Sequence, residues 1–310
     1  MNEQAELLFR GQPLETGSQR MGELRSSVDV LHDTGTLQDR FRRDGYLYLP
    51  GLLDRDLLEA ARLAMLQKLS KDGYLDPNYP VHMGVAKGDT APTAVSMKDL
   101  ARDNAPLTQL LYSGAMIDFY ERFLGGPVRH FDFTWCRVKP SGQDAATRPH
   151  YDIVYMGRGT KNLFTSWTPL GDVPKRMGGL MILENSHRQE EIKSTYGQLD
   201  VDVYCTNYDD AKAIESGEKL WQRPDGGAYA EDAIALRREL DGRWLTADYQ
   251  LGDLLIFGMY TMHASMDNLT DRLRLSTDTR YQLASEPVDE RWIGEDPIAH
   301  GPEAKQGMIC

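Results

Sequence analysis

The chain has 310 residues, of which 41% are hydrophobic, and it carries a formal net charge of −12 at pH 7. This length is sufficient for one large core with peripheral helices in a single domain. The negative charge argues against a nucleic-acid substrate, because phosphate backbones require basic surfaces. No apolar run reaches the roughly 18 residues of a membrane helix, and the N-terminus lacks the basic and apolar regions of a secretory signal.

The chain has three cysteines, Cys136, Cys205 and Cys310. An odd and sparse set indicates a reducing compartment and no disulfide framework. We therefore expect a cytoplasmic protein that does not associate with membranes. The sequence gives no indication of the oligomeric state.

In chain order, residues 1–36 are expected to be a loosely structured leader with one or two short helices, ahead of a single domain over 37–310. A helix over 37–44 should end at Gly45 and be followed by a short strand over 46–50. Asp54 or Asp56 can cap the next helix. The apolar positions of that helix follow helical spacing: Leu58, Ala61, Met65, Leu66 and Leu69. Another helix is predicted from about 106 to 124, with Gly125 as its stop.

The rest of the chain is mainly strand. We predict strands at about 129–139, 150–155, 162–169, 179–184, 244–248, 254–258 and 273–283. Strands that follow helices in this way favour a barrel or sandwich with helical buttresses. The stretch 189–250 is a variable insert of 62 residues between two core strands, far longer than a turn requires.

Two His-x-Asp pairs occur, beginning at His130 and His150. Residues two apart on a strand project to one face, so either pair could supply two metal ligands. His150 follows a turn and a polar loop, where functional residues tend to lie. His130 lies within a continuous predicted strand, and we expect it to be a partly buried residue paired with a nearby polar group. His150, Asp152 and a distant His263 would form the facial triad of non-haem Fe(II) oxygenases, which leaves the opposite face of the metal open.

The segment after His263 supplies a candidate anion anchor. Residues 272–281 alternate polar and apolar, as a half-buried strand does. An arginine there can grip a carboxylate with its planar fork. Alternation places Arg272 and Arg274 on the same face, so spacing alone does not choose between them.

With these motifs, the chain resembles the phytanoyl-CoA dioxygenase family of Fe(II)/2-oxoglutarate oxygenases. The resemblance runs from about residue 38 to 285. It rests on the following segments: FRRDGYLYLPGLL at 41–53, KPSG at 139–142, the His150 pair, TSWTPLGD at 165–172, GGLMILENSHR at 178–188, and 252–274.

The resemblance implies a double-stranded β-helix (jelly-roll, cupin-like) core, mainly β with helical buttresses. It implies iron on His150, Asp152 and His263. It also implies 2-oxoglutarate on Arg274, eleven residues after His263. Two further residues occupy positions that commonly contact the cosubstrate, namely Ser265 and Trp167. The implied enzyme is an oxidoreductase, a dioxygenase that uses O2 and 2-oxoglutarate to oxidise a C–H bond of a small organic molecule, with release of succinate and CO2.

Two positions depart from the family pattern. Tyr151 stands where many relatives carry Gln, and Asn185 replaces the Gly of the usual Gly-Ser-His segment. Neither change touches a ligand. Asp152 is intact, whereas relatives with Gly or Ala there halogenate, so hydroxylation-type chemistry is favoured.

Several side chains keep more than one interpretation. Trp167 fits a core aromatic as well as a cosubstrate contact. Arg137 and Lys139 share a strand face and could meet substrate or cosubstrate, or form a solvated edge. The remaining three are expected to be structural or stay unassigned: His187 as a loop-bridging residue, Tyr151 as a packing residue and Lys98 without a role.

Two other functions use the same ligands. A zinc hydrolase can be built on two His and a carboxylate, but it has no need for the arginine strand. A non-catalytic ligand-binding protein would be indicated by the loss of a ligand, and none is lost.

The insert 189–250 holds 14 acidic and 7 basic residues and is rich in Tyr and Trp. It is either a solvated excursion with a helix near 230–239, or a lid and substrate wall. Coenzyme A brings several phosphates and calls for a basic rim. An acidic wall therefore predicts a free small-molecule substrate, neutral or cationic and partly apolar, without a CoA carrier.

Overall fold

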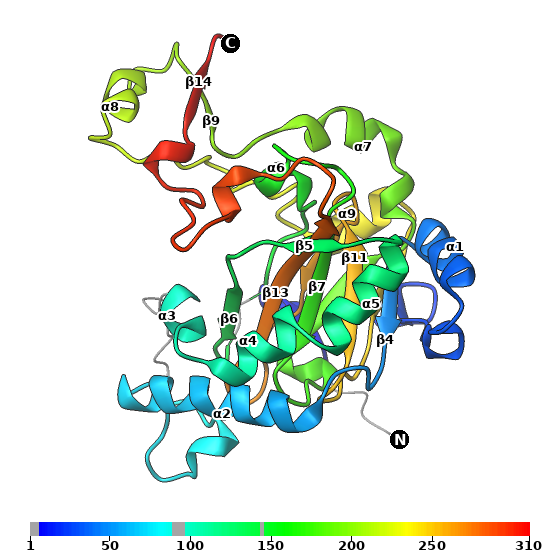
Figure 1. Ribbon diagram of the computed structural model, residues 1–310. Coiled ribbons are helices and arrows are strands. Elements are labelled where there is room, and N and C mark those ends of the chain that lie inside the picture. Colours follow the sequence, from blue (N-terminus) through cyan, green and yellow to red (C-terminus); the bar gives the residue numbers. More distant parts are fainter. Residues whose placement is uncertain (1–5, 89–96, 143–145) are drawn as a thin grey trace.

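Two β-sheets form the core of the computed structural model, which describes residues 6–88, 97–142 and 146–310 (Figure 1). The large sheet has the strand order β4-β11-β7-β13-β5, with β6 also paired to β13, and the small sheet has the order β12-β8-β10-β3. The strands of the large sheet are β4 (Tyr46–Leu49), β5 (Val128–His130), β6 (Trp135–Lys139), β7 (Phe164–Pro169), β11 (Leu254–Gly258) and β13 (Arg274–Leu283). Those of the small sheet are β3 (Met21–Glu23), β8 (Leu180–Leu183), β10 (Trp244–Thr246) and β12 (His263–Ser265).

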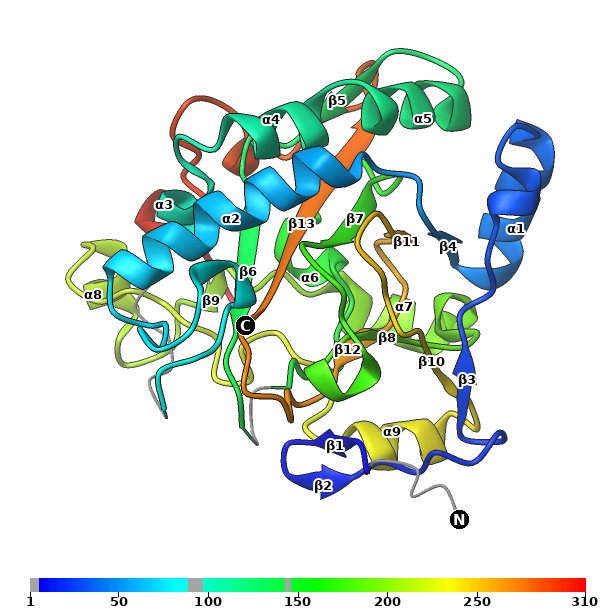
Figure 2. The same cartoon turned by 90° about the horizontal axis from the view of Figure 1, so that it is seen from below.

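Helices cover the outer face of the large sheet. Figure 2 shows α2, α4 and α5 lying across β13 and β7 on one side. The described helices are α1 (Thr34–Asp44), α2 (Arg55–Lys71), α3 (Met97–Ala101), α4 (Ala105–Tyr112), α5 (Ala115–Leu124), α6 (Ile153–Met156), α7 (Glu190–Ser194), α8 (Ala211–Glu215) and α9 (Ala233–Glu239). The β core with helical buttresses is thus as predicted, and no helix of the described residues is long and apolar enough to cross a membrane.

Local signals explain the first two helices. Gly45 ends α1 with a left-handed φ of 77°, which glycine adopts without steric cost. Asp54 caps α2 by accepting a hydrogen bond from the Leu57 amide at 3.0 Å. The buried face of α2 consists of the predicted residues Leu58, Ala61, Met65, Leu66 and Leu69.

The two faces of strand β13 carry different kinds of side chain, apolar on one face and charged on the other. Its side chains are buried on both sides up to Gln282. Leu275 and Tyr281 pack into the apolar core under the helices. By strand alternation, Arg274, Asp278 and Arg280 point the other way, into the space between the sheets. Charged residues inside a sheet sandwich require a functional or pairing explanation.

Residues 6–36 correct the expectation of a loosely structured leader. They form a short hairpin of β1 (Leu8–Phe9) and β2 (Gln12–Pro13) and then β3. Strand β3 pairs in parallel with β10, with Met21 opposite Trp244. The leader therefore contributes an outer strand of the small sheet.

Two predicted elements are divided in the structure. The helix expected over 106–124 is α4 and α5, because Ser113 is extended and Gly114 has a φ of 55° between them. The strand expected over 129–139 is β5 and β6. Between these strands the Asp132 amide donates to the Trp292 carbonyl in place of a β13 partner.

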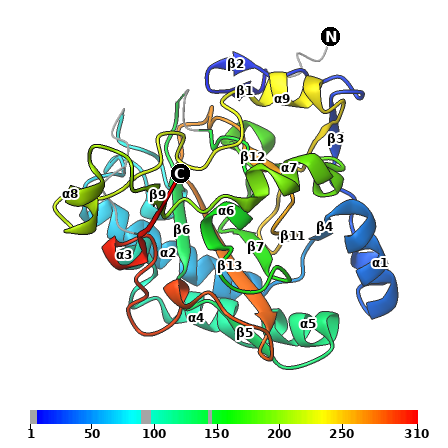
Figure 3. The same ribbon diagram turned by 90° about the horizontal axis from the view of Figure 1, so that it is seen from above.

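The cysteines also correct a prediction, since Cys205 and Cys310 form a disulfide across 105 residues. They meet because β9 (Val203–Cys205) and β14 (Gln306–Met308) pair in parallel and bring the insert and the C-terminus side by side (Figure 3). Cys136 is free and buried.

Candidate active site

The three predicted metal ligands lie together between the sheets. One ligand atom each from His150, Asp152 and His263 falls within 4.8 Å of the others. Both Nε2 atoms are 3.6 Å from Asp152 Oδ1. The backbones of His150 and His263 exchange two hydrogen bonds, of 3.1 and 3.2 Å, and this bridge sets the imidazoles side by side.

Asp152 reaches the centre by a different route from the one predicted. The strand expected over 150–155 is absent, and Asp152 instead begins α6 with φ −66° and ψ −24°. The Ile153 amide donates to the Met259 carbonyl, which turns the chain directly after the carboxylate. This tertiary hydrogen bond, and not the alternation of side chains along a strand, brings the Asp152 carboxylate to the same place as the His150 imidazole.

Backbone carbonyls orient both imidazoles. Nδ1 of His150 lies 2.8 Å from the Arg148 carbonyl, and Nδ1 of His263 lies 3.0 Å from the Thr261 carbonyl. Each Nδ1 therefore carries the proton, which leaves the Nε2 lone pair facing Asp152. Burial, with the nearby charge of His150, lowers the pKa of His263 to about 4 and keeps that ring neutral, as a metal ligand must be.

The second oxygen of Asp152 is held by two donors that the motifs did not reveal. Thr165 Oγ1 donates to Oδ2 at 2.5 Å, and Arg280 Nη2 donates at 2.9 Å. Burial alone would raise the pKa of Asp152, but the charge of Arg280 and the two imidazoles hold that pKa well below its usual value. The carboxylate is thus ionised with Oδ1 free. Arg280 is six residues beyond Arg274, so extending the strand alternation would have identified it.

This donor set fits a single metal ion. Two imidazole nitrogens and one carboxylate oxygen lie close enough together to bind one ion, and these are the ligand types of a facial triad. Among the described residues, no fourth His, Cys, Asp or Glu belongs to this group. The centre therefore suits an ion that keeps open positions for other ligands.

Two buried cations lie at the far end of the same interior. Lys139 and Arg274 are cross-strand partners in β6 and β13, and each is only 4% exposed. Within the described residues, neither has a carboxylate within 4 Å, and Arg274 Nε has no hydrogen-bond partner. Burial lowers the pKa of Arg274 to about 10, and burial with the charge of Arg274 lowers the pKa of Lys139 well below its ordinary value. Unpaired buried cations are costly, so this end of the site calls for an anion.

Ser265 offers a third donor beside these cations. Its Oγ accepts from Lys139 Nζ at 2.5 Å and from the Thr147 amide at 2.9 Å. Both lone pairs are then occupied, so the hydroxyl proton must be donated elsewhere. Trp167 is buried against Tyr249, with its ring 5.8 Å from the guanidinium of Arg274. It is a core aromatic that also borders the anion position.

Arg272 does not share this face, which corrects the prediction from alternation. It precedes β13, and its side chain is 47% exposed in a separate cavity with Leu273 and Leu275. Arg274 therefore faces the interior between the sheets, whereas Arg272 lies in a different cavity.

A cavity of about 390 Å³ opens onto the triad. Its walls include Trp135, Arg137, Arg148, Tyr155, Arg280 and His300. Of the described residues of the insert 189–250, Ala228 alone lines it. The predicted acidic substrate wall is therefore wrong, because no carboxylate of the described insert lines the cavity; Glu231 and Asp202 only pair with the wall residues Arg148 and His300.

The remaining residues singled out from the sequence lie outside the metal group. His130 is half-buried in β5, 3.5 Å from Asp132, as expected of a paired strand residue. His187 contacts a backbone carbonyl of α1 at 3.2 Å and so bridges its loop. The hydroxyl of the buried Tyr151 donates to a carbonyl at 2.7 Å. Lys98 forms a surface ion pair at 2.6 Å.

Comparison with known proteins agrees with this geometry. The model of the phytanoyl-CoA dioxygenase (PhyH) family matches residues 41–276. Two curated relatives are 1-deoxypentalenic acid 11-beta-hydroxylases, from Streptomyces arenae (27% identical) and Streptomyces exfoliatus (26%), each alignment covering 83% of both chains.

Solved structures share the fold. EctD from S. alaskensis, crystallised with 2-oxoglutarate and 5-hydroxyectoine, aligns with a TM-score of 0.56 at 15% identity, over 99% of this chain and 97% of its own. The non-heme alpha ketoglutarate dependent epimerase SnoN aligns with a TM-score of 0.54 at 21% identity, over 86% and 92%. With the family match extending over most of the chain, the predicted resemblance is confirmed. The protein belongs to the phytanoyl-CoA dioxygenase family of iron- and 2-oxoglutarate-dependent oxygenases.

Proposed function

We propose that His150, Asp152 and His263 hold Fe(II), while Arg274, Ser265 and Lys139 hold the distal carboxylate of 2-oxoglutarate. The observation that carries this assignment is the pair of buried cations without a carboxylate partner. A dicarboxylate that reaches from the triad to this pair would place its distal carboxylate between the two buried cations. A zinc hydrolase on the same ligands would leave the two cations unexplained. A non-catalytic 2-oxoglutarate-binding protein would use them in the same way, and release of succinate separates it from an oxygenase.

The protein side chains then have separable tasks. When bound, iron and 2-oxoglutarate would supply O2 activation: two of the four electrons that reduce O2 come from the conversion of 2-oxoglutarate to succinate and CO2, and the other two come from the substrate C–H bond. Arg274 and Ser265 orient the cosubstrate by charge and by a directed hydroxyl proton. Arg280 and Thr165 hold Asp152 in the orientation that leaves one oxygen for the metal. The buried aromatic walls exclude bulk water from the centre.

We also propose a core architecture and a cellular location. The two facing sheets, with the triad between them, fit a double-stranded β-helix core, and its outer strand β3 lies before residue 37. A cytoplasmic location fits a chemistry that depends on reduced iron, although the Cys205–Cys310 disulfide removes the cysteine argument for it.

For the substrate, we propose a free small organic molecule without a CoA carrier. The cations at the cavity already have partners, since Arg137 pairs with Asp278 at 2.8 Å and Arg148 pairs with Glu231. No set of unpaired surface cations lines the described cavity to receive several phosphates. The curated relatives are named for 1-deoxypentalenic acid, with no CoA in the name. Because no acidic wall lines the cavity, the structure does not favour a neutral or cationic substrate over an anionic one.

The test is turnover of 2-oxoglutarate. We expect the Fe(II)-loaded enzyme to release succinate faster with a free small molecule than with its CoA thioester, across matched pairs. Equal or faster release with the thioesters would contradict the substrate proposal. Absence of any 2-oxoglutarate-dependent succinate with Fe(II) would contradict the assignment of the site.

A further inference from the structure

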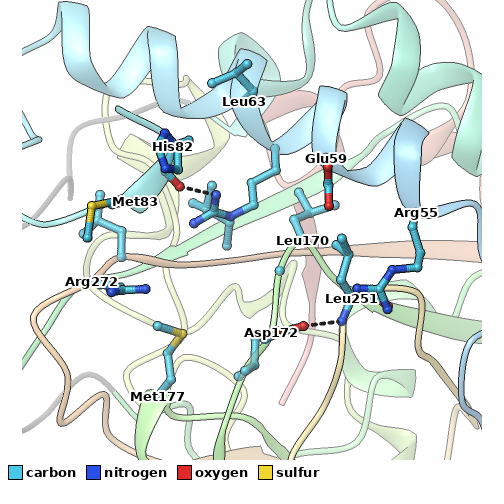
Figure 4. A pocket seen from close by; sticks show the side chains of 15 residues that line it. Arg55, Glu59, Leu63, His82, Met83, Leu170, Asp172, Met177, Leu251 and Arg272 are labelled. Atoms are coloured by element: carbon cyan, nitrogen blue, oxygen red, sulfur yellow. Dashed lines mark hydrogen bonds between the residues drawn. The ribbon is translucent and has the colours of Figure 1, made fainter. Parts of the chain in front are cut away.

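A second cavity, of about 580 Å³, lies on the opposite face of the large sheet from the metal centre. Figure 4 shows Arg55 and Glu59 descending from α2 on one side, and Arg272 and Met177 lying across from them. The cavity shares no lining residue with the metal cavity. Leu273 and Leu275 form part of its wall, and they flank Arg274 on the same strand, so the sheet itself separates the two sites.

The floor of this cavity is apolar. It is formed by buried side chains from β13 and the loops beside it, namely Leu170, Val173, Met177, Leu273 and Leu275. Leu63 of α2 stands at the rim with 38% of its surface exposed. Apolar surface left open to water in a concave site favours a ligand with an apolar body.

The guanidinium of Arg62 is built into the cavity wall. It donates to the His82 carbonyl at 2.5 Å and forms no ion pair with any described residue. Gly171 and Gly84 give it room, because a Cβ at these positions would lie 3.0 and 3.3 Å from the Arg62 head group. Both glycines have positive φ, so larger residues are disfavoured there. Arg62 is thus held in place without a partner for its charge.

Arg272 and Arg55 add charge around the same opening. The only ion pair of Arg272 among the described residues is a loose one of 3.9 Å with the adjacent Asp271. Arg55 donates to the Leu251 carbonyl at 2.9 Å. Burial lowers the pKa of Arg62, and the charge of Arg272 lowers it further, whereas the charges of Asp172 and Glu59 act in the opposite direction. An anion between Arg62 and Arg272 would offset the repulsion between these two cations.

The charge balance selects the class of anion. Among the described residues, three guanidinium groups line the cavity together with two carboxylates, Glu59 and Asp172. The carboxylate of Asp172 accepts a hydrogen bond from the Leu251 amide at 2.8 Å. Leaving His82 aside, the excess is one positive charge, which suits a monoanion better than a phosphate dianion. We propose that this cavity is an accessory binding site for a small amphipathic monocarboxylate, with its carboxylate on Arg62 and Arg272 and its apolar body on the leucine floor.

The proposal is tested by ligand-observed NMR titration of the full chain with octanoate, octyl phosphate and 1-octanol. We expect octanoate to bind one site more tightly than either analogue. Arg62→Met and Arg272→Met keep the apolar stems and remove the charges, and each should weaken octanoate binding at least about tenfold. Because Arg272 is exposed, its variant tests the site even if Arg62→Met fails to fold.

Two matched variants serve as controls. Arg42→Met removes an exposed arginine on α1, and Arg148→Met removes one at the metal cavity. Both should bind octanoate as the parent does. Octanoate binding that is absent, no tighter than that of 1-octanol, weaker than that of octyl phosphate, or lost in Arg148→Met would overturn the proposal. None of these readouts requires iron, 2-oxoglutarate or turnover.

Discussion

Each of the three proposed metal ligands has a second atom that is hydrogen-bonded to the protein. The imidazoles are fixed by carbonyls of Arg148 and Thr261, and Asp152 is fixed by Arg280 and Thr165. The free protein therefore already holds its donors in the binding arrangement. Little conformational entropy remains to be lost when a metal enters.

This arrangement leads to a prediction about metal content. Replacing His150, Asp152 or His263 by Ala should abolish Fe(II) binding, since two ligands remain. His130→Ala removes the other His-x-Asp histidine and should retain iron at the parental level. Metal analysis of the four anaerobically reconstituted variants decides the matter. Iron lost from the His130 variant and kept in the His150 variant would mean that the wrong pair has been chosen.

The two arginines near the start of β13 give a second prediction. Arg274→Ala leaves the distal carboxylate of 2-oxoglutarate without its main partner in a buried site. One-sided loss of such a pair costs about 2–5 kcal/mol, or at least about thirtyfold in Kd. Arg272→Ala, on the other face of the sheet, should change the Kd less than about twofold. Anaerobic calorimetry with 2-oxoglutarate measures both, and the reverse order would place the anchor at Arg272.

Lys139 gives a third prediction, which concerns pH. Burial and the charge of Arg274 depress its pKa, and a bound carboxylate would raise that pKa again. At pH values between the depressed and the ordinary pKa, 2-oxoglutarate binding should therefore take up a proton, and affinity should fall as pH rises. Calorimetry in two buffers of different ionisation enthalpy measures this uptake. Lys139→Met should reduce it, whereas identical uptake in the variant would exclude Lys139 as the titrating group.

At the scale of elements, the sequence predicted what local chemistry determines. Capping at Asp54, the stop at Gly45 and helical spacing define α1 and α2. The approach of Asp152 to the metal was missed because it depends on the tertiary bond from Ile153 to Met259. The role of Lys139 stayed open because its position opposite Arg274 depends on the register of β6 against β13. Contacts between distant segments carry no local signal.

The C-terminal segment forms another element-scale unit through Arg291. This arginine is buried, with Nη2 2.5 Å from Asp289 and Nη1 bonded to Asp202 of the insert. His300, which lines the metal cavity, contacts Asp202 at 2.9 Å. The ion cluster therefore joins the insert, the C-terminal segment and one wall of the active site.

Breaking this cluster should loosen the segment locally. Arg291→Met leaves two buried carboxylates short of a partner, at a cost of about 3–5 kcal/mol. We expect faster hydrogen exchange over 196–206 and 286–308, with β7 and β11 still protected. Arg238→Met, which breaks an exposed pair with Glu15, is the matched control and should change little. Faster exchange spread evenly over both sheets would contradict this local role.

For the whole molecule, the family and the sheet-rich fold could be predicted because motifs are spread over most of the chain. The boundary of the folded unit could not. Residues before the first motif contain no recognisable pattern, yet β3 completes the small sheet beside β10. A strand of only three residues is too short for its sequence to show the alternation of polar and apolar residues that identifies a strand.

The place of β3 has a consequence for any shortened form of this protein. A chain begun at residue 41, where the family match starts, would expose the backbone amides and carbonyls of β10 along an unprotected edge. Such edges recruit strands from other molecules. Light scattering should show self-association of the 41–310 form, whereas a 17–310 form that keeps β3 should stay as dispersed as the full chain. Equal scattering from the two forms would show that β10 tolerates solvent. Association of the 41–310 form alone would show that the segment containing β3 keeps β10 from pairing with other molecules.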